Sequence, residues 1–139
     1  MRHGYRLVLL GLVALVLAGC GDDDEFEAEL TGGKERPTPV STSATGTVEA
    51  TLEELTLTVA GTFEGLSGPA TGAHIHGPAS EEEAAGILCP LVATADRSGT
   101  VIGTCLFTEE QVDQLRDGRM YVNVHTAANP AGEIRGQLE

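Results

Sequence analysis

Apolar and polar residues alternate on both sides of Glu53-Glu54, and this pattern constrains the fold more than any other. The apolar members of the alternation are Val48, Ala50, Leu52, Leu55, Leu57 and Val59. Successive side chains of a strand point to opposite faces, so the pattern predicts two half-buried β-strands. A hairpin turning at Glu53-Glu54 sets Leu52 opposite Leu55 and places every apolar residue on one face. Because Glu-Glu is not a favoured two-residue turn, we expect a tip longer than two residues.

Strand-like patterns continue along the rest of the chain, with one short helix among them. Further strands are expected at 26–30, 72–77, 87–94, 100–107, 120–126 and 132–138. Thr108 and Gln111 have the spacing of a capping box, and Gly118 stands where a helix would end. Seven or eight antiparallel strands with one short helix define the all-β class, and a Greek-key β-sandwich is the expected architecture.

The first residues predict export. Arg2 and Arg6 flank the start of an apolar run from 7 to 18, which is typical of a secretory signal and too short to cross a bilayer in the ordinary way. The run ends in Leu-Ala-Gly-Cys, which resembles the bacterial lipobox, where the cysteine is lipidated and the chain is cut just before it. We therefore expect a lipid anchor on Cys20. An ordinary cleaved signal peptide or a short anchor is the alternative.

This interpretation divides the chain into three parts. A lipoprotein signal peptide is expected at 1–19, an acidic tether at 20–25 and one folded domain at 26–139. The folded domain would then be anchored to a membrane of the cell envelope through its N-terminal lipid. It would face the periplasm or the exterior.

The charge balance excludes one class of partner. The chain has 21 Asp and Glu against 8 Lys and Arg, for a net charge of −13, and loss of two arginines with the signal peptide would bring it to about −15. Such a surface repels phosphate backbones, so no nucleic acid is expected as a partner. No nucleophile elbow, phosphate loop or nucleotide motif is present, so catalysis is not predicted. The ligand, a protein or a small molecule, is not identified by the sequence.

Two cysteines remain besides Cys20. Cys89 and Cys105 are placed symmetrically about Arg97, so a hairpin that turns at 95–99 would set them opposite each other. Opposed residues of antiparallel strands lie within reach of a disulfide, and an exported protein keeps such a bond. We expect a structural Cys89–Cys105 disulfide. A reactive or metal-binding thiol pair is the alternative.

The histidines form the candidate functional site. By the alternation of a strand, His74 and His76 share one face, and Tyr121, Asn123 and His125 share a face of a later strand. If the two strands are neighbours, the three imidazoles converge and can hold copper or zinc with an open coordination position.

A polar surface without metal is the alternative for the same face. In that case the histidines would hydrogen-bond and pack together with the other polar side chains of these strands. Its expected members besides the histidines are Tyr121, Asn123, Glu133 and Arg135.

The order of several motifs resembles the CHRD family, whose domain was first described in chordin. The motifs are Gly-Thr-Val (46–48), Gly-Leu-Ser (65–67), Ala-His-Ile-His-Gly (73–77), Tyr-Val-Asn-Val-His-Thr (121–126) and Gly-Glu-Ile-Arg-Gly-Gln (132–137). The resemblance covers roughly residues 26–138. It implies an extracytoplasmic, sandwich-like domain with no established activity, and so favours a non-catalytic binding or envelope-structural role.

A fainter likeness is to copper–zinc superoxide dismutase. It is carried by the His-x-His-Gly strand, a later Val-His strand and an Asn-x-Ala-Gly-x-x-Arg turn at 129–135. On this likeness His74, His76 and His125 stand where copper ligands stand, and Arg135 where an anion-guiding arginine stands. Apart from His3 in the expected signal peptide, no further histidine is present to bridge to zinc. The likeness therefore implies, as the alternative function, a mononuclear three-histidine metal protein.

Overall fold

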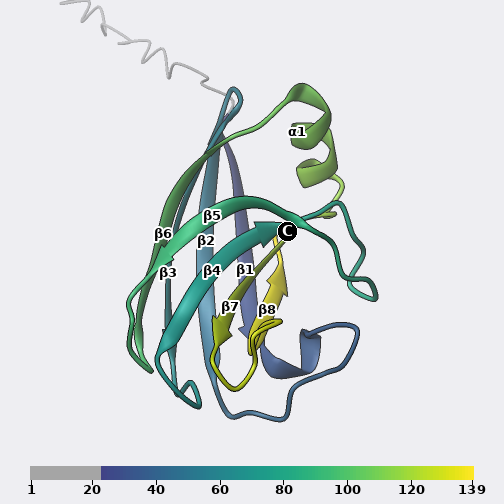
Figure 1. Ribbon diagram of the computed structural model, residues 1–139. Helices are drawn as coiled ribbons and strands as arrows, with labels where there is room; N and C mark the ends of the chain where they lie inside the picture. Colours follow the sequence, from purple (N-terminus) through teal and green to yellow (C-terminus); the bar gives the residue numbers. More distant parts are fainter. Residues whose placement is uncertain (1–22) are drawn as a thin grey trace, which may run out of the picture.

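The structure is a computed structural model, and it describes residues 23–139. Eight antiparallel strands form one closed barrel in the order β1-β2-β3-β6-β5-β4-β7-β8, and β1 pairs with β8 to complete the ring (Figure 1). The all-β class, the eight strands and the one short helix agree with the sequence prediction. The expected β-sandwich is wrong, because a single sheet closes on itself instead of two sheets packing face to face.

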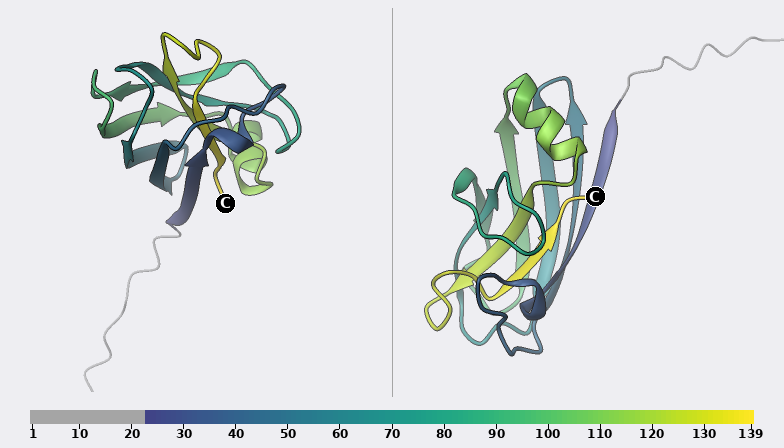
Figure 2. Two further views of the ribbon diagram at one scale, coloured as in Figure 1. Left: turned by 90° about the horizontal axis from the view of Figure 1, so that it is seen from below. Right: turned by 90° about the vertical axis from the view of Figure 1, so that its right-hand side faces the viewer.

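The strands have four to nine residues, and their connections range from the two-residue turn between β2 and β3 to the 14 residues between β6 and β7. Their bounds are β1 (Asp24–Thr31), β2 (Thr45–Glu53), β3 (Thr56–Glu64), β4 (Ala70–His76), β5 (Ile87–Ala93), β6 (Gly99–Leu106), β7 (Tyr121–Thr126) and β8 (Ile134–Gln137). A 3-10 turn, η1 (Gly32–Lys34), follows β1, and helix α1 (Glu109–Arg116) separates β6 from β7. In the right-hand view of Figure 2, α1 lies at one end of the barrel and η1 at the other. Among the described residues no helix has the length and apolar character needed to cross a bilayer.

The hairpin of β2 and β3 has the predicted faces but another register. Leu52 pairs with Leu57 and Ala50 with Val59, so the register is displaced by two residues from the expected one. Since two is the period of a strand, the apolar side chains of the paired residues still point into the barrel, but Leu55, expected on the same face, lies in the turn and is 36% exposed. The expected longer tip is wrong: the turn has two residues, Glu54 and Leu55, with Glu54 at a positive φ of 55°. The Leu55 carbonyl accepts a hydrogen bond from the amide of Phe107, which holds this tip against the end of β6.

The hairpin of β5 and β6 has the register that the cysteine spacing predicts. Val92 pairs with Ile102 and Ala93 with Val101, so the pairing is symmetric about Arg97. Cys89 and Cys105 form a disulfide with their Cα atoms 6.0 Å apart. The predicted structural bond is therefore present, and it joins these strands where their ladder is no longer continuous.

Local sequence signals define the ends of the helix. The Thr108 hydroxyl accepts from the amide of Gln111, and the Gln111 side chain accepts from the amide of Thr108, so the predicted capping box is present. Val112 and Leu115 are buried beneath the helix. Gly118 has a φ of 69°, which a glycine adopts without strain, directly after the helix.

The expected tether and the strand at 26–30 need one correction at their boundary. Asp24 and Glu25 are part of β1, pairing with Leu52 and Thr51, and the Asp24 carboxylate forms an ion pair with Arg116 of α1 at 2.7 Å. Two of the acidic residues assigned to the tether are thus part of the barrel. The signal peptide and Cys20 lie outside the described residues.

Candidate metal centre

Strand pairing brings the three histidines together. β4 lies between β5 and β7, and its pairing with β7 sets Gly72 opposite His125, His74 opposite Asn123 and His76 opposite Tyr121. The condition stated from the sequence, that the two strands be neighbours, is therefore met. The rings project from the outer face of the barrel, while Ile75 of the same strand is buried in the core.

One ring nitrogen from each histidine lies within 4.8 Å of the other two. The shortest of these separations is 2.9 Å, between Nδ1 of His74 and Nε2 of His125. Three nitrogens placed tetrahedrally about 2.0–2.1 Å from one ion lie about 3.3–3.4 Å from one another. The widest separation, up to 4.8 Å, would therefore have to close by about 1.5 Å for the rings to share one ion. Among residues 23–139 this is the one group of histidine, cysteine and acidic side chains with ligand atoms this close.

Backbone carbonyls fix the orientation of two of the rings. Nδ1 of His76 donates to the Ala85 carbonyl at 3.0 Å, and Nδ1 of His125 donates to the Pro130 carbonyl at 2.9 Å. Because a carbonyl only accepts, both rings carry their proton on Nδ1 and expose the lone pair of Nε2. Metal-binding histidines are typically oriented by such a bond to their other nitrogen.

The Nε2 atom of His76 is buried and has no hydrogen-bond partner in the structure. A buried polar atom without a partner costs about 1–3 kcal/mol of stability unless something binds it. His76 is 7% exposed and His125 9%, whereas His74 is more open to solvent. An ion held by the three nitrogens would thus have its open coordination position on the solvent side, next to His74.

The site favours neutral imidazoles. Burial lowers the pKa of His74 and of His76, and the proximity of the other histidines lowers both further. For His76 the hydrogen bond to Ala85 partly opposes this effect. Neutral imidazole is the form that ligates a metal, so the lowered pKa of these two rings favours the binding form at neutral pH.

Tyr121 and Arg135 support the buried histidine. The Tyr121 ring stacks on the His76 ring with a 3° angle between the planes and 4.9 Å between centroids. The Arg135 guanidinium lies 3.5 Å from the centre of the Tyr121 ring, on a cation–π contact. These two residues of the expected polar patch therefore lie beside the histidines and hold one of them in place.

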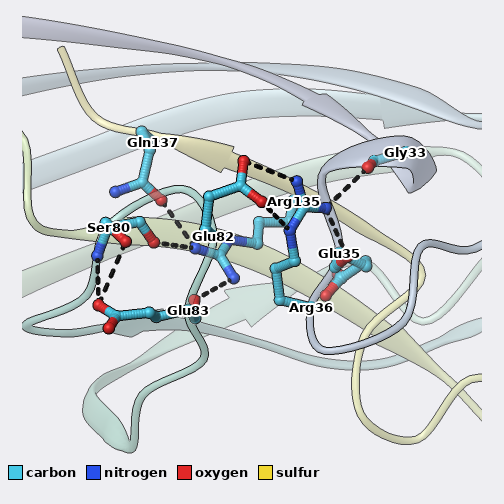
Figure 3. A network of polar contacts seen from close by, with 8 residues as sticks. All are labelled: Gly33, Glu35, Arg36, Ser80, Glu82, Glu83, Arg135 and Gln137. Carbon is cyan, nitrogen blue, oxygen red and sulfur yellow. Dashed lines mark hydrogen bonds and ion pairs between the residues drawn. The ribbon is translucent and has the colours of Figure 1, made fainter.

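Arg135 also fastens the segment 77–86 over the site. Its guanidinium donates to the carbonyls of Glu83 at 2.8 Å and Ser80 at 3.0 Å, and to the side-chain oxygen of Gln137 at 3.0 Å (Figure 3). Arg36, from the loop after η1, pairs with Glu82 of the same segment at 3.3 Å. Two loops far apart in the sequence are thereby joined above β7 and β8.

Glu35 is a residue that the sequence did not single out. Its carboxyl is buried in the loop after η1, at 3% exposure, and one of its oxygens has no partner. Burial raises its pKa from 4.5 to about 7, against the opposing effects of Arg135 and Asn123. Asn123, predicted as part of the patch, donates to the Ala131 carbonyl at 3.2 Å. Nothing in the local sequence marks Glu35, since its burial depends on how the loop folds over β7 and β8.

Glu133 belongs to a different group of contacts. Its carboxylate accepts hydrogen bonds from the amide of Ser67 at 2.9 Å, from the Asn129 side chain at 2.9 Å and from the Thr126 hydroxyl at 3.3 Å, and it also contacts the Ser67 hydroxyl. The Thr42 hydroxyl also donates to it at 3.4 Å, so Glu133 ties together the connecting segments 32–44, 65–69 and 127–133 at one end of the barrel instead of facing the histidines. Alternation alone placed it with Arg135, but it precedes β8, where strand geometry has not yet begun.

Comparison with known protein families identifies the chain. A family model for the CHRD domain matches residues 26–138, and this protein belongs to the CHRD family. The resemblance seen in the sequence motifs is thus confirmed over nearly all of the described residues. No match was found among characterised proteins, and none among solved structures.

Proposed function

We propose that this CHRD domain is an extracytoplasmic binding module whose ligand is one copper or zinc ion. The ion would be held by Nδ1 of His74 and by Nε2 of His76 and His125. The observation that carries the proposal is the convergence of these nitrogens, with one of them buried and without a partner. The family and the disulfide support an extracellular setting.

Metal binding would require one change in the site. Without metal, the Nδ1–H of His74 donates to Nε2 of His125. As a ligand, His74 must carry its proton on Nε2 instead, and its partial exposure allows water to accept that proton's hydrogen bond. The bound ion would offer an open position for a small ligand, as a three-histidine site does. Redox catalysis is not part of the proposal, and the likeness to superoxide dismutase stays a prediction.

The test is metal analysis of the protein isolated from its native compartment, followed by thermal unfolding with and without added copper or zinc. We expect close to one equivalent of metal and a melting temperature that rises with metal, because an ion that binds the folded state stabilises it. His125→Ala should abolish the rise while the apo protein stays folded. Thr71→Ala, an exposed position on the same strand as His74, is the matched control and should keep the rise.

A non-metal binding or envelope-structural role is the second candidate. The observation in its favour is that the His74–His125 hydrogen bond already satisfies two of the three nitrogens without an ion. If the isolated protein holds no stoichiometric metal and neither ion changes its melting temperature, this second role stands and the metal site is rejected.

Lipid anchoring at Cys20 is part of the same proposal and is supported by the signal-like sequence before it. Cys20→Ser should move the protein from the membrane fraction to the soluble fraction. A variant that stays as membrane-bound as the parent would contradict the anchor, whatever the result of the metal analysis.

A further inference from the structure

The large apolar side chains that the described chain exposes are concentrated on one side of the barrel. Val92 is 68% exposed, Ile102 52% and Leu106 79%, and all three point outward from β5 or β6. The two others, Ile87 at 58% and Leu55 at 36%, lie at the start of β5 and at the hairpin tip that contacts β6. The strands β1, β2, β4, β7 and β8 and helix α1 expose none.

These side chains form one continuous surface with their neighbours on β3. Ala60 pairs with Ile102, which pairs with Val92, so an apolar row crosses three strands. Thr58 and Thr104 form the next row, and Leu106 lies opposite Thr56. We call this surface the apolar face and define it by Thr58, Ala60, Val92, Ile102, Thr104 and Leu106. In Figure 1 its strands lie side by side on the left of the barrel.

The apolar face carries no charge in a chain whose net charge is −13. Between Thr56 and Thr62 the outward residues of β3 are threonine and alanine, and those of β6 are Thr100, Ile102, Thr104 and Leu106. The outward residues of β1 are instead Glu25, Glu27 and Glu29. Two copies of an acidic protein repel each other through most of their surface. The apolar face is where two copies can meet without bringing carboxylates together.

We propose that the apolar face is the contact surface between two copies of this protein. The closed barrel offers no free strand edge, so association has to use side chains on a face. A two-fold axis through the Ala60–Ile102–Val92 row would bring the same apolar row of each copy together, as in an isologous dimer. The proposal does not depend on metal binding.

A membrane surface fits this face less well than a second copy does. Residues that settle at a bilayer interface are tryptophan, tyrosine, lysine and arginine, and the apolar face has none of them. Acidic residues flank it, with Glu53 and Glu54 near Leu106 at one end and Glu64 at the other. The face is also smaller than a standard interface, which has about 20–30 residues on each side. The dimer is therefore expected to be a weak one that forms with increasing concentration.

The test is disulfide cross-linking of the full chain in its native compartment. Ala60→Cys places a thiol at the proposed axis, and Thr47→Cys places one at an exposed outward position of β2 as the matched control. We expect a disulfide-linked dimer several-fold more abundant for Ala60→Cys than for Thr47→Cys. Adding Ile102→Glu should reduce the Ala60→Cys dimer by about tenfold, because the axis would then bring two carboxylates together.

Sedimentation of the purified full chain without introduced cysteines gives an independent readout. The parent should shift from monomer to dimer with concentration, and Ile102→Glu should stay monomeric with an unchanged melting temperature, since the residue is exposed. Equal cross-linking of the two cysteine variants, or a parent that is monomeric throughout, would overturn the proposal. The proposal would also be overturned if the parent bound phosphatidylcholine vesicles but formed no dimer, and Ile102→Glu abolished that vesicle binding.

Discussion

Outward-pointing side chains are exposed on one side of the barrel and buried on another. On β1 the outward Glu25, Glu27 and Glu29 are exposed, and buried residues alternate with them. On β7 and β8 every residue is buried, on the outward face as well as the inward one. We call the outer surface of β1 and β2 the open wall, and that of β7 and β8 the covered wall. The difference comes from the loops around 32–43 and 77–86, which fold over the covered wall, where Arg36 and Arg135 fasten them.

The comparison shows that the polarity of a strand face does not decide whether the face meets water. Polar side chains on the open wall are solvated, so single substitutions there should have small effects. Polar side chains on the covered wall have exchanged water for protein partners, so removing one leaves a buried group unpaired. Four substitutions test this contrast, from the largest expected effect to the smallest.

Arg135→Ala should produce the largest loss of stability. It removes a buried hydrogen bond to Gln137, two partly buried ones to the carbonyls of Ser80 and Glu83, and the cation–π contact with Tyr121. We expect the free energy of unfolding to fall by about 3–5 kcal/mol, measured by denaturant titration. Arg97→Ala, at an exposed turn, is the control and should change it little. Equal effects of the two substitutions would show that the covered wall is no different from an exposed turn.

Glu133→Gln should cost about 2 kcal/mol, because an amide cannot accept all the hydrogen bonds that this carboxylate receives. Burial by itself would raise the pKa of Glu133, but the hydrogen bonds from Ser67, Asn129 and Thr126 outweigh it and lower the pKa below 4.5. The folded protein therefore gains stability from this group above pH 4.5 and loses it as the pH falls through the lowered pKa. The difference between parent and variant should shrink accordingly in thermal unfolding at acidic pH.

Glu35→Gln should instead raise the free energy of unfolding. Burial raises the pKa of Glu35 from 4.5 to about 7, so the parent loses stability as the pH rises from 4.5 to 7, where only the unfolded chain releases the proton. That shift sets an upper bound of roughly 3 kcal/mol, and we expect a gain of about 1–2 kcal/mol at pH 8 for the variant. At pH 4 the two proteins should melt at nearly the same temperature. A variant less stable than the parent at pH 8 would contradict this account.

Glu27→Lys on the open wall should have the smallest effect. Glu27 lies directly opposite Glu49 on β2, and like charges in that position destabilise a sheet. Replacing one of them by lysine should raise the stability by a few tenths of a kcal/mol, and added salt should remove most of the gain. Unfolding titrations at low and high ionic strength measure both quantities. If the variant is less stable than the parent at low salt, then Glu27 makes a stabilising contact and the explanation by like-charge repulsion is wrong.

The sequence predicted the direction of nearly every side chain because alternation is a local property of a strand. His74, His76, His125, Tyr121 and Asn123 all lie on the predicted faces. The closed barrel was not predicted, because alternating residues look the same in a sandwich and in a barrel. The two differ only in whether β1 reaches β8, and that contact joins residues far apart in the sequence.

The sequence also fell short wherever a loop determines the environment of a residue. The burial of Glu35 and the hydrogen bonds of Arg135 to Ser80 and Glu83 depend on loop conformations for which the chain carries no periodic signal. The predicted register of the β2–β3 hairpin differs from the observed one by two residues for a related reason. Both registers point the same apolar residues into the barrel except Leu55, and the contact of Leu55 with Phe107 that accompanies the observed register is not local.

The order of the strands around the ring implies an order of folding. The β2–β3 and β5–β6 hairpins pair residues close in sequence and can form first, since closing a short loop costs little entropy. The pairing of β4 with β7, and of β1 with β8, joins distant residues and has to come later. The three histidines therefore come together only near the end of folding. A metal ion bound by them could therefore not act as a template for the early steps and would be acquired by a barrel that is already nearly complete.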